Sequence, residues 1–350
     1  MTAPSPRVAA AWAPVNIALI KHWGLHSPGA GVGDDLPARP SLSLTLEHGS
    51  TTTVTWRDQP DHRILLNGAV LTRSSGEKAA ASHAFLEAVR EAAGLGPLRA
   101  SVQAVSEVPL AAGFASSAAG GAALTVAALA AAGLYDHEAD RDLAWCRRLG
   151  SVSALRSLRG GVVRLDVDHA ASTVALSNVR TDLDLTVLGC LVQGDRKKVS
   201  TSAGQARVAT SPYRAQFERD ADARLDQVVA ALEAGDLARV GAIAEADALA
   251  MHAVMLTSRP PLVYATDATW RVWRQVMAWR EEGGRSPQGF STLDAGPNPH
   301  VLCARADADD LAARLEAHPD VRRVFRSAVA TDGAQRIPAP DTADLSHRKT

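Results

Sequence analysis

Hydrophobic and polar residues alternate at residues 41–46 and 51–56, which is the pattern of β-strands that bury one face. Short β-prone runs at residues 8–12 and 17–20 predict further strands, and residues 98–105 are also expected to form a strand. We predict a turn at His48-Gly49-Ser50, and a hairpin over residues 64–71 that turns at Asn67-Gly68. Residues 24–40 are rich in Gly, Pro and Asp, which predicts a loop.

Helical periodicity becomes more common beyond residue 190. Along the whole chain we expect helices at residues 77–93, 118–132, 140–149, 213–234, 237–255, 266–282 and 306–317. Further strands are expected at residues 162–167, 183–192, 291–293, 301–304 and 322–330. The sequence therefore predicts an α+β protein of two parts, residues 1–190 and 191–330, with a flexible tail at residues 331–350.

Composition narrows the class of protein. The 350 residues are 46% hydrophobic and 21% charged with a formal net charge of −1, so no global field attracts nucleic acid or an anionic membrane. The sequence shows no signal-peptide pattern, and no apolar run approaches the roughly 18 residues of a membrane span. Three cysteines (Cys146, Cys190 and Cys303) are widely spaced, which argues against a disulfide framework or a zinc site. We expect a cytoplasmic enzyme that binds neither nucleic acid nor membranes.

Residues 109–121 read Pro-Leu-Ala-Ala-Gly-Phe-Ala-Ser-Ser-Ala-Ala-Gly-Gly and lead into an Ala-rich helix. A helix start presents unpaired N–H groups and the positive end of the helix dipole. Small residues leave room for an anion to approach that backbone (Gly113, Ala115, Ala119 and Gly120). Ser116 and Ser117 can add hydroxyl contacts or a metal ligand. The segment is either a phosphate cradle or a tight loop before a buried helix.

Three other segments carry unusual residue choices. Lys21 ends an apolar strand, where a lysine either serves chemistry or extends to solvent. Arg156 lies among small and hydroxyl residues in the run 150–161, where it either holds a carboxylate bidentately or forms a surface salt bridge. Asp294 lies in a turn beside Gly-Pro, where aspartates are also common for local hydrogen bonding alone.

Together and in this order, the four segments resemble the mevalonate diphosphate decarboxylases of the GHMP kinase superfamily. The matching runs are Asn-Ile-Ala-Leu-Ile-Lys-x-Trp-Gly, Ala-Ala-Gly-x-Ala-Ser-Ser-Ala-Ala-Gly, Ser-x-Ser-x-x-Arg-Ser-Leu-x-Gly-Gly and Asp-Ala-Gly-Pro-Asn. Similarity continues at residues 40–45, 197–200 and 251–255, so that it spans residues 8–305. The resemblance implies a two-lobed α+β GHMP kinase fold with an S5 domain 2-like N-terminal lobe and a ferredoxin-like C-terminal lobe. The active site would lie in the cleft between the lobes.

The resemblance also implies an activity. Enzymes of this family use ATP and Mg²⁺ to phosphorylate the tertiary 3-hydroxyl of mevalonate 5-diphosphate. They then lose phosphate and CO₂ to form isopentenyl diphosphate in the mevalonate pathway. Family members are homodimers, which is the assembly expected here. A GHMP kinase without decarboxylation is the main enzymatic alternative, but Lys21, Arg156 and Asp294 are all present.

Roles for individual residues follow from the same resemblance. Asp294 would accept the hydroxyl proton, Lys21 would neutralise the transferring phosphoryl group, and Arg156 would clamp the substrate carboxylate. The backbone of residues 113–120, including Ala118, would cradle the ATP phosphates, with Ser116 or Ser117 toward the metal. The remaining substrate contacts would come from His22, Ser151, Ser153, Ser200 and Thr201.

Departures from the family pattern cluster at one end of the substrate. Leu25 replaces a lysine and Ser202 an arginine, and both cations help to hold the terminal diphosphate in the family. Charge-assisted hydrogen bonds contribute about 1.5–3 kcal/mol each, so these losses matter. Neighbouring cations could replace them (His22, His26, Arg39, Arg159, Arg196 and Lys197). Otherwise the substrate is mevalonate 5-phosphate and the product isopentenyl phosphate.

Overall fold

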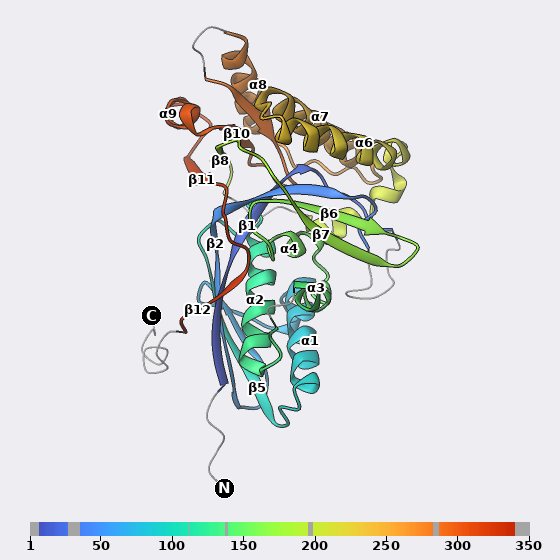
Figure 1. Ribbon diagram of the computed structural model, residues 1–350, viewed down its shortest axis with the longest axis vertical. Coiled ribbons are helices and arrows are strands. Elements are labelled where there is room, and N and C mark those ends of the chain that lie inside the picture. The colour runs from blue at the N-terminus through green and yellow to red at the C-terminus, as the bar shows by residue number, and fades with distance from the viewer. Residues whose placement is uncertain are drawn as a thin grey trace.

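Two antiparallel-dominated sheets, each covered by helices, make up the chain in the computed structural model (Figure 1). The structure describes residues 7–26, 36–110, 112–136, 139–194, 199–282 and 287–339, without the side chains of residues 139–142 and 202. The predicted α+β class is confirmed. The first sheet and its helices form the lower part of Figure 1, and the second sheet with its helices forms the upper part.

The first sheet has eight strands. Six of them are hydrogen-bonded in the order β12 (Gln335–Ile337), β1 (Arg7–Ile20), β2 (Ser41–Asp58), β5 (Leu98–Ser106), β3 (Arg63–Leu66) and β4 (Ala69–Leu71). The start of β2 also pairs with β6 (Val162–Asp168), and β6 pairs with β7 (Thr173–Val179). All pairs are antiparallel except β3 with β5. The predicted hairpin at Asn67-Gly68 is confirmed, and both residues have positive φ (47° and 81°).

The second sheet has four antiparallel strands in the order β11 (Arg323–Ala328), β8 (Leu185–Leu191), β10 (His300–Ala304) and β9 (Gly289–Thr292). It joins the first sheet through the isolated bridge between Leu46 and Val329. A single apolar core crosses the junction. It contains Val15 and Ile17 of β1, Val187 of β8 and Leu302 of β10, each 2% exposed or less. The two sheets are therefore parts of one packed body.

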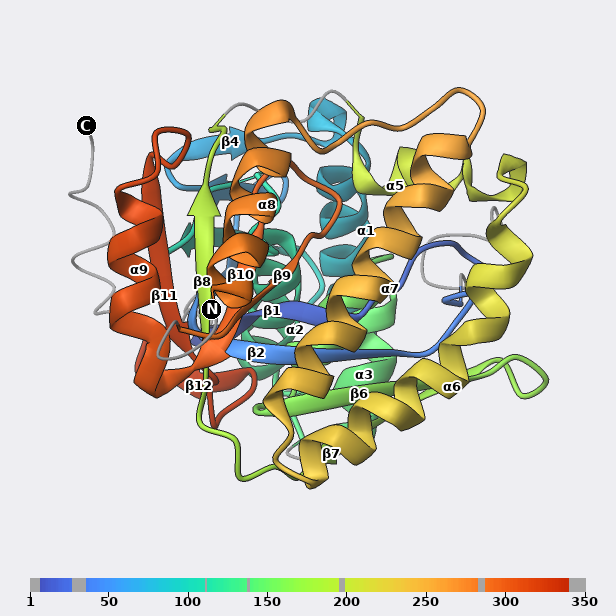
Figure 2. The ribbon, with the colours of Figure 1, turned by 90° about the horizontal axis from the view of Figure 1, so that it is seen from above.

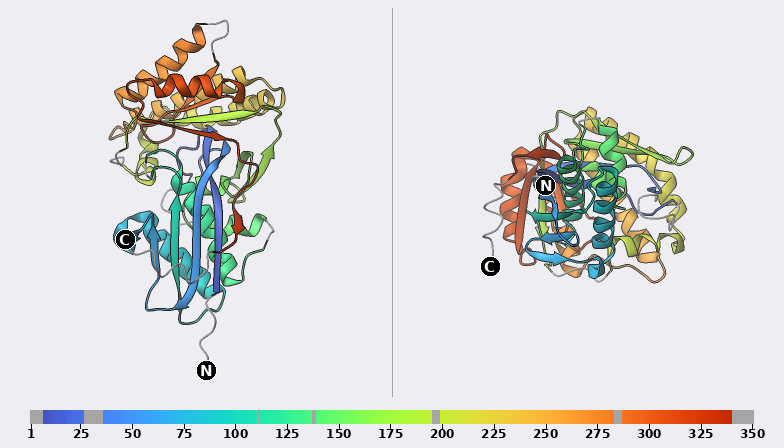
Figure 3. Two further views of the ribbon diagram at one scale, coloured as in Figure 1. Left: turned by 90° about the vertical axis from the view of Figure 1, so that its left-hand side faces the viewer. Right: turned by 90° about the horizontal axis from the view of Figure 1, so that it is seen from below.

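Helices cover the sheets in two groups (Figures 1 to 3). One face of the first sheet carries α1 (Glu77–Ala92), α2 (Ser116–Ala132), α3 (Ala139–Arg147) and α4 (Val152–Arg156). On the second sheet pack α7 (Leu237–Thr257), α8 (Asp267–Glu281) and α9 (Ala308–Glu316). The helix α6 (Arg214–Glu233) packs along α7 and contacts β1, β2 and β7 of the first sheet, and the short α5 (Thr201–Gln205) precedes it. Over an 18-residue window α7 has a mean hydropathy of 1.3, enough for a membrane span, but 56% of that window is buried.

Two predicted breaks in the first sheet are wrong. β1 runs unbroken through Ala13 and Pro14, and β2 runs through the expected turn at His48-Gly49-Ser50. Gly49 pairs with Pro14 across the ladder, and a Cβ there would lie 2.5 Å from the Trp12 ring. The glycine is needed because the two strands approach closely, and not because the chain reverses.

The predicted flexible tail is corrected in part. Residues 335–337 form β12 and pair with Ala10, Ala11 and Trp12 of β1, while residues 340–350 lie outside the described part of the chain. The strand is only three residues long, so its sequence carries little periodic signal. The same reason applies to α4 and α5, which have five residues each and were also not predicted.

Gly241 makes the packing of α7 against β9 testable. A Cβ at Gly241 would overlap the Phe290 ring, whereas a Cβ at Gly120 of α2 would have no atom within 4 Å. Gly241→Ala gains about 1 kcal/mol of helix propensity but overpacks the interface at a cost of about 1–3 kcal/mol. We expect a lower denaturation midpoint for Gly241→Ala and an unchanged or higher one for Gly120→Ala. Equal midpoints for the two variants would contradict this packing.

Candidate active site

An ion pair between Lys21 and Asp294 lies at the centre of the candidate site. Lys21 follows the last residue of β1, and Asp294 lies in the turn between β9 and β10. The Lys21 Nζ lies 2.6 Å from the Asp294 Oδ1, and the side chains are 1% and 26% exposed. The structure therefore brings together two predicted catalytic residues that are 273 positions apart in the sequence.

A local irregularity in β1 directs the Lys21 side chain. The β1–β2 register shifts between Ala18 and Ile20, as in a β-bulge, and the ladder ends at Ile20. The Lys21 Nζ also donates to the Ala18 carbonyl at 2.7 Å. The ammonium is thus held by one carbonyl and one carboxylate oxygen in a buried position, which fixes its place beside Asp294.

Asp294 is ionised at neutral pH. Burial alone would raise the pKa of its carboxyl, but Lys21, His300 and Arg156 outweigh burial and hold the pKa below its usual value. The Asp294 carbonyl lies 3.3 Å from Nε2 of His252 on α7. Burial lowers the pKa of His252 to about 4, so this imidazole is neutral at physiological pH.

Arg156 lies at the end of α4 and faces the polar side of β2. Because side chains alternate along a strand, Ser41 and Ser43 share one face of β2 and Leu42 and Leu44 the other. The Arg156 Nε donates to the Ser43 hydroxyl at 2.6 Å and Nη1 to the Ser41 hydroxyl at 2.9 Å. Arg156 is 3% exposed, and burial lowers its pKa to about 10. No carboxylate among the described residues forms an ion pair with this guanidinium, which remains charged and available to an anion.

The predicted phosphate loop lies directly against the Asp294 turn. Gly113 and Ala115 have positive φ (91° and 52°), so the chain turns sharply into α2. A Cβ on Gly296 would lie 2.8 Å from the Gly113 Cα, so a side chain at Gly296 would separate the two segments. Asn298, 1% exposed, donates to the Ala112 carbonyl at 2.7 Å. The loop and the catalytic turn are therefore one unit.

Ser116 and Ser117 are the first two residues of α2, which begins two residues before its predicted start at Ala118. The Ser117 hydroxyl accepts a hydrogen bond from the Lys78 Nζ at 2.7 Å. Lys78 was missed in the sequence, because a lysine in the first turn of an exposed helix has no distinguishing pattern. The Ala118 N–H donates to the Ala115 carbonyl at 2.9 Å, so it is already used within the helix. Gly120 has open space around its Cα.

The predicted substrate residues of the first lobe surround Arg156. Ser151 precedes α4, and its hydroxyl lies 3.3 Å from that of Ser153. The Asn16 side-chain amide of β1 fixes the start of α4 by donating to the Ser153 carbonyl at 2.9 Å. Burial, followed by the charge of Arg156, lowers the pKa of His22 to about 3, so His22 is neutral. Its Nε2 is buried and has no hydrogen-bond partner among the described residues.

The remaining predicted substrate residues, Ser200 and Thr201, lie at the start of α5. Ser200 precedes this helix and caps it by accepting the Ala203 N–H at 3.1 Å, and Thr201 is its first residue. α5 reaches the catalytic segment through Trp23, because a Cβ on Gly204 would touch the Trp23 ring at 3.0 Å. The Ser202 side chain and the cations Arg196 and Lys197 lie outside the described part of the chain. Leu25 forms an isolated bridge with Pro37.

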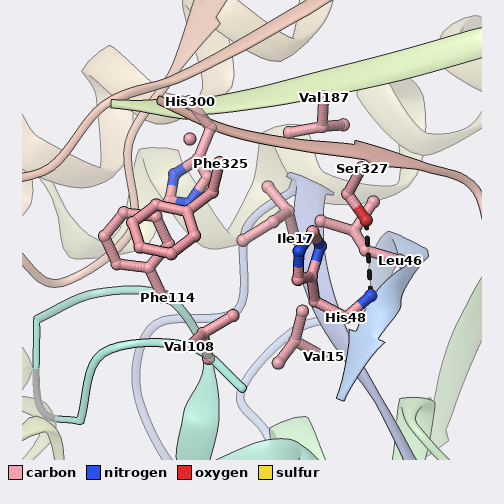
Figure 4. A pocket seen from close by; sticks show the side chains of 11 residues that line it. Val15, Ile17, Leu46, His48, Val108, Phe114, Val187, His300, Phe325 and Ser327 are labelled. Atoms are coloured by element: carbon pink, nitrogen blue, oxygen red, sulfur yellow. Dashed lines mark hydrogen bonds between the residues drawn. The ribbon is translucent and has the colours of Figure 1, made fainter. Parts of the chain in front are cut away.

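A separate small pocket lies where the two sheets meet (Figure 4). Its lining is mostly apolar and includes Val15 and Ile17 of β1 and Phe114 of the phosphate loop, with His48 and His300 beside them. The ring centroids of Phe114 and His300 lie 5.1 Å apart. Lys21, Arg156 and Asp294 do not line this pocket.

The site suits a nucleotide better than a metal held by protein alone. Within the described residues no group of three or more His, Cys, Asp or Glu side chains could hold a metal ion. The left-handed turn before α2, its two serines and Lys78 fit an anionic phosphate chain. A divalent ion here would be shared between serine hydroxyls and phosphate oxygens.

Comparisons with known proteins identify the family of the chain. Residues 13–175 match the family model "Diphosphomevalonate decarboxylase-like N-terminal domain", and residues 187–347 match "Mevalonate 5-diphosphate decarboxylase C-terminal domain". The diphosphomevalonate decarboxylase of Aspergillus fumigatus is 30% identical over 91% of this chain and 82% of its own length.

Solved structures show the same likeness. The crystal structure of mevalonate diphosphate decarboxylase from Staphylococcus aureus is 28% identical over 95% of this chain and 98% of that chain, with a TM-score of 0.84. A structure of MDDEF in complex with MVAPP, AMPPCP and magnesium is 32% identical over 96% of this chain and 100% of that chain. Its TM-score is also 0.84. The chain therefore belongs to the diphosphomevalonate decarboxylase family of the GHMP superfamily.

Proposed function

We propose that this enzyme uses ATP and Mg²⁺ to decarboxylate mevalonate 5-diphosphate, forming isopentenyl diphosphate, ADP, phosphate and CO₂. The observation that carries this proposal is the 2.6 Å Lys21–Asp294 ion pair beside the unpaired Arg156 and the phosphate loop. The complex of MDDEF with MVAPP, AMPPCP and magnesium supports both the substrate and the cofactors.

Asp294 starts the reaction. A tertiary hydroxyl is a poor nucleophile, and hydroxide is a poor leaving group, so the 3-hydroxyl is first converted to a phosphate ester. The ionised Asp294 accepts the hydroxyl proton as the oxygen bonds to the γ-phosphorus and ADP leaves. Lys21 balances the negative charge of the transferring group and keeps Asp294 ionised.

Arg156 governs the second half of the reaction. Its guanidinium is fixed by Ser41 and Ser43 and binds the substrate carboxylate. The C3–O bond then breaks and phosphate leaves, while the C1–C2 electron pair forms the C2–C3 double bond and CO₂ is released. Holding the carboxylate keeps the breaking C–C bond aligned with the departing phosphate.

The start of α2 and Lys78 would hold the ATP phosphates. Ser116 or Ser117 would share the Mg²⁺ ion with them, and Ser151, Ser153, His22, Ser200 and Thr201 would line the substrate. When bound, Mg²⁺ neutralises phosphate charge during the transfer. Placing Lys78 beside Ser117 brings a cation to the same point.

We further propose that the enzyme is a cytoplasmic homodimer that binds neither nucleic acid nor membranes. Three buried free cysteines support a reducing compartment. Leu249 and Leu256, seven residues apart on α7, are 44% and 46% exposed and support a protein contact there. The net charge of −1 supports the absence of polyanionic partners.

Asp294→Asn tests the proposed base. The amide cannot accept the hydroxyl proton, so we expect kcat to fall about 100- to 10,000-fold. The melting temperature should also fall, because the buried Lys21 loses its counterion, while the variant remains folded at the assay temperature. CO₂ release and ADP formation are followed together. Asp166→Asn, at an exposed ion pair with Arg164, is the matched control and should retain wild-type kcat. An Asp294→Asn variant with wild-type turnover would overturn the mechanism.

A panel of three substrates tests the proposed specificity. Mevalonate, its 5-phosphate and its 5-diphosphate are compared with Mg-ATP. Because a terminal phosphate adds charge-assisted hydrogen bonds, we expect kcat/KM to be about 10- to 100-fold higher for the diphosphate than for the monophosphate. A preference for the 5-phosphate would show that the replacements at Leu25 and Ser202 changed the substrate. ADP formation with a stable phosphorylated product would identify a kinase instead.

A further inference from the structure

Asp247 of α7 is the most completely buried charged group beside the site, and the mechanism above gives it no role. It is 0% exposed, and its carboxylate accepts three hydrogen bonds. Oδ1 accepts from Nη2 of Arg39 and from Nη1 of Arg224, both at 3.0 Å. Oδ2 accepts from the backbone N–H of Lys21 at 2.6 Å.

The free energy of folding does not by itself explain the group of Asp247, Arg39 and Arg224. Removing an aspartate and two arginines from water costs several kcal/mol per ion, which their attraction only partly offsets. Arg39 is 1% exposed, and its guanidinium also lies 3.9 Å above the Phe217 ring. A buried arginine–aspartate–arginine group is therefore better explained by the geometry that it imposes than by the free energy that it contributes.

That geometry concerns Lys21. The β1–β2 ladder ends at Ile20, so the N–H of the next residue has no partner strand. Asp247 supplies the missing acceptor from the other lobe and fixes the backbone from which the Lys21 side chain reaches Asp294. Two arginines in turn fix the carboxylate itself, one from the segment before β2 and one from α6.

We propose that Asp247 is a positioning residue that holds the Lys21 backbone so that its ammonium stays against Asp294. The inference rests on the proposed function for the roles of Lys21 and Asp294. Through this contact α7 sets the distance between the end of the first sheet and the catalytic turn of the second. Among the described residues no hydrogen bond or ion pair joins Asp247 to Asp294, so the effect of Asp247 on Asp294 passes through Lys21.

The consequence is a measurable change in proton affinity at Asp294. The charged and titratable groups that act on Asp294 are Lys21, Arg156 and His300, with His252 against its carbonyl. The charged groups that face Asp247 are Arg39 and Arg224. The Nη2 of Arg224 also lies 3.4 Å from the Asp220 Oδ2. If Lys21 moves away, Asp294 loses its strongest stabilising charge. It then binds its proton at higher pH, and the acidic limb of the activity profile moves upward.

Asp247→Asn is the direct test. The amide keeps the size of the side chain but loses the charge that the two arginines hold. We expect kcat to fall about 10- to 100-fold, as a displacement of about 1 Å does at a reacting group, with both KM values within about threefold. The acidic limb of kcat should move to higher pH, and Asp247→Glu, which restores the charge, should move it back.

Glu245→Gln is the matched control. Glu245 is a second buried carboxylate on α7, and it accepts from Nη2 of Arg280 at 2.9 Å and from the Ser291 N–H at 2.8 Å. Its loss should lower the melting temperature without moving the pH profile. An equal shift in Glu245→Gln, or a wild-type profile in Asp247→Asn, would overturn the proposal.

A second variant and an NMR titration test the positioning role independently of Asp247→Asn. If Asp247→Asn does not fold, Arg224→Gln removes one of the two counterions at a side chain that is 24% exposed. It should move the acidic limb in the same direction, and an unmoved limb would refute the role of Asp247. The Asp294 carboxyl is also titrated by ¹³C NMR without substrate. That titration tests the positioning role even if the wild-type protein releases no CO₂, which would refute the proposed function alone.

Discussion

The ion pair between Lys21 and Asp294 is the contact on which the rest of the site depends, because its two members come from different sheets. Buried charges are tolerated only where their geometry is held by further polar contacts. Here the ammonium also binds the Ala18 carbonyl, and the Asp294 backbone meets His252. A site of this kind works only if the two lobes are fixed relative to one another, and the continuous apolar core across the junction meets that need.

A second constraint is the close approach of the phosphate loop to the catalytic turn. Gly113 and Gly296 face each other without side chains, and Asn298 ties the turn to the Ala112 carbonyl. The same Asn298 amide donates to the Gln193 carbonyl at 2.9 Å, beyond the end of β8. The proposed phosphate loop and the turn that carries Asp294 are thus held together by one group of backbone contacts, so that movement of either segment would disturb the other.

How much the sequence could predict depended on whether a feature is local. The long amphipathic helices follow from periodicity, and the ordered motifs indicated Lys21, Arg156 and Asp294 together. Gly49 was interpreted as a turn because its reason, contact with Trp12, lies on another strand. Asp247 and Lys78 were missed because their partners are remote in sequence. Two carboxylates in the mostly apolar α7, Glu245 and Asp247, were the only sequence signal, and a carboxylate in a helix does not reveal which groups it binds.

The buried charges around the site also bear on the kind of ligand that it takes. Lys21, Arg39, Arg156 and Arg224 carry four positive charges, whereas Asp220, Asp247 and Asp294 carry three negative ones. Two buried nitrogens of Arg39 have no hydrogen-bond partner among the described residues. Of these four cations only Arg156 has no ion pair among the described residues, and a positive charge that is 3% exposed is unfavourable until an anion offsets it. This arrangement favours a substrate that brings its own negative charge, because a neutral alcohol would leave Arg156 uncompensated.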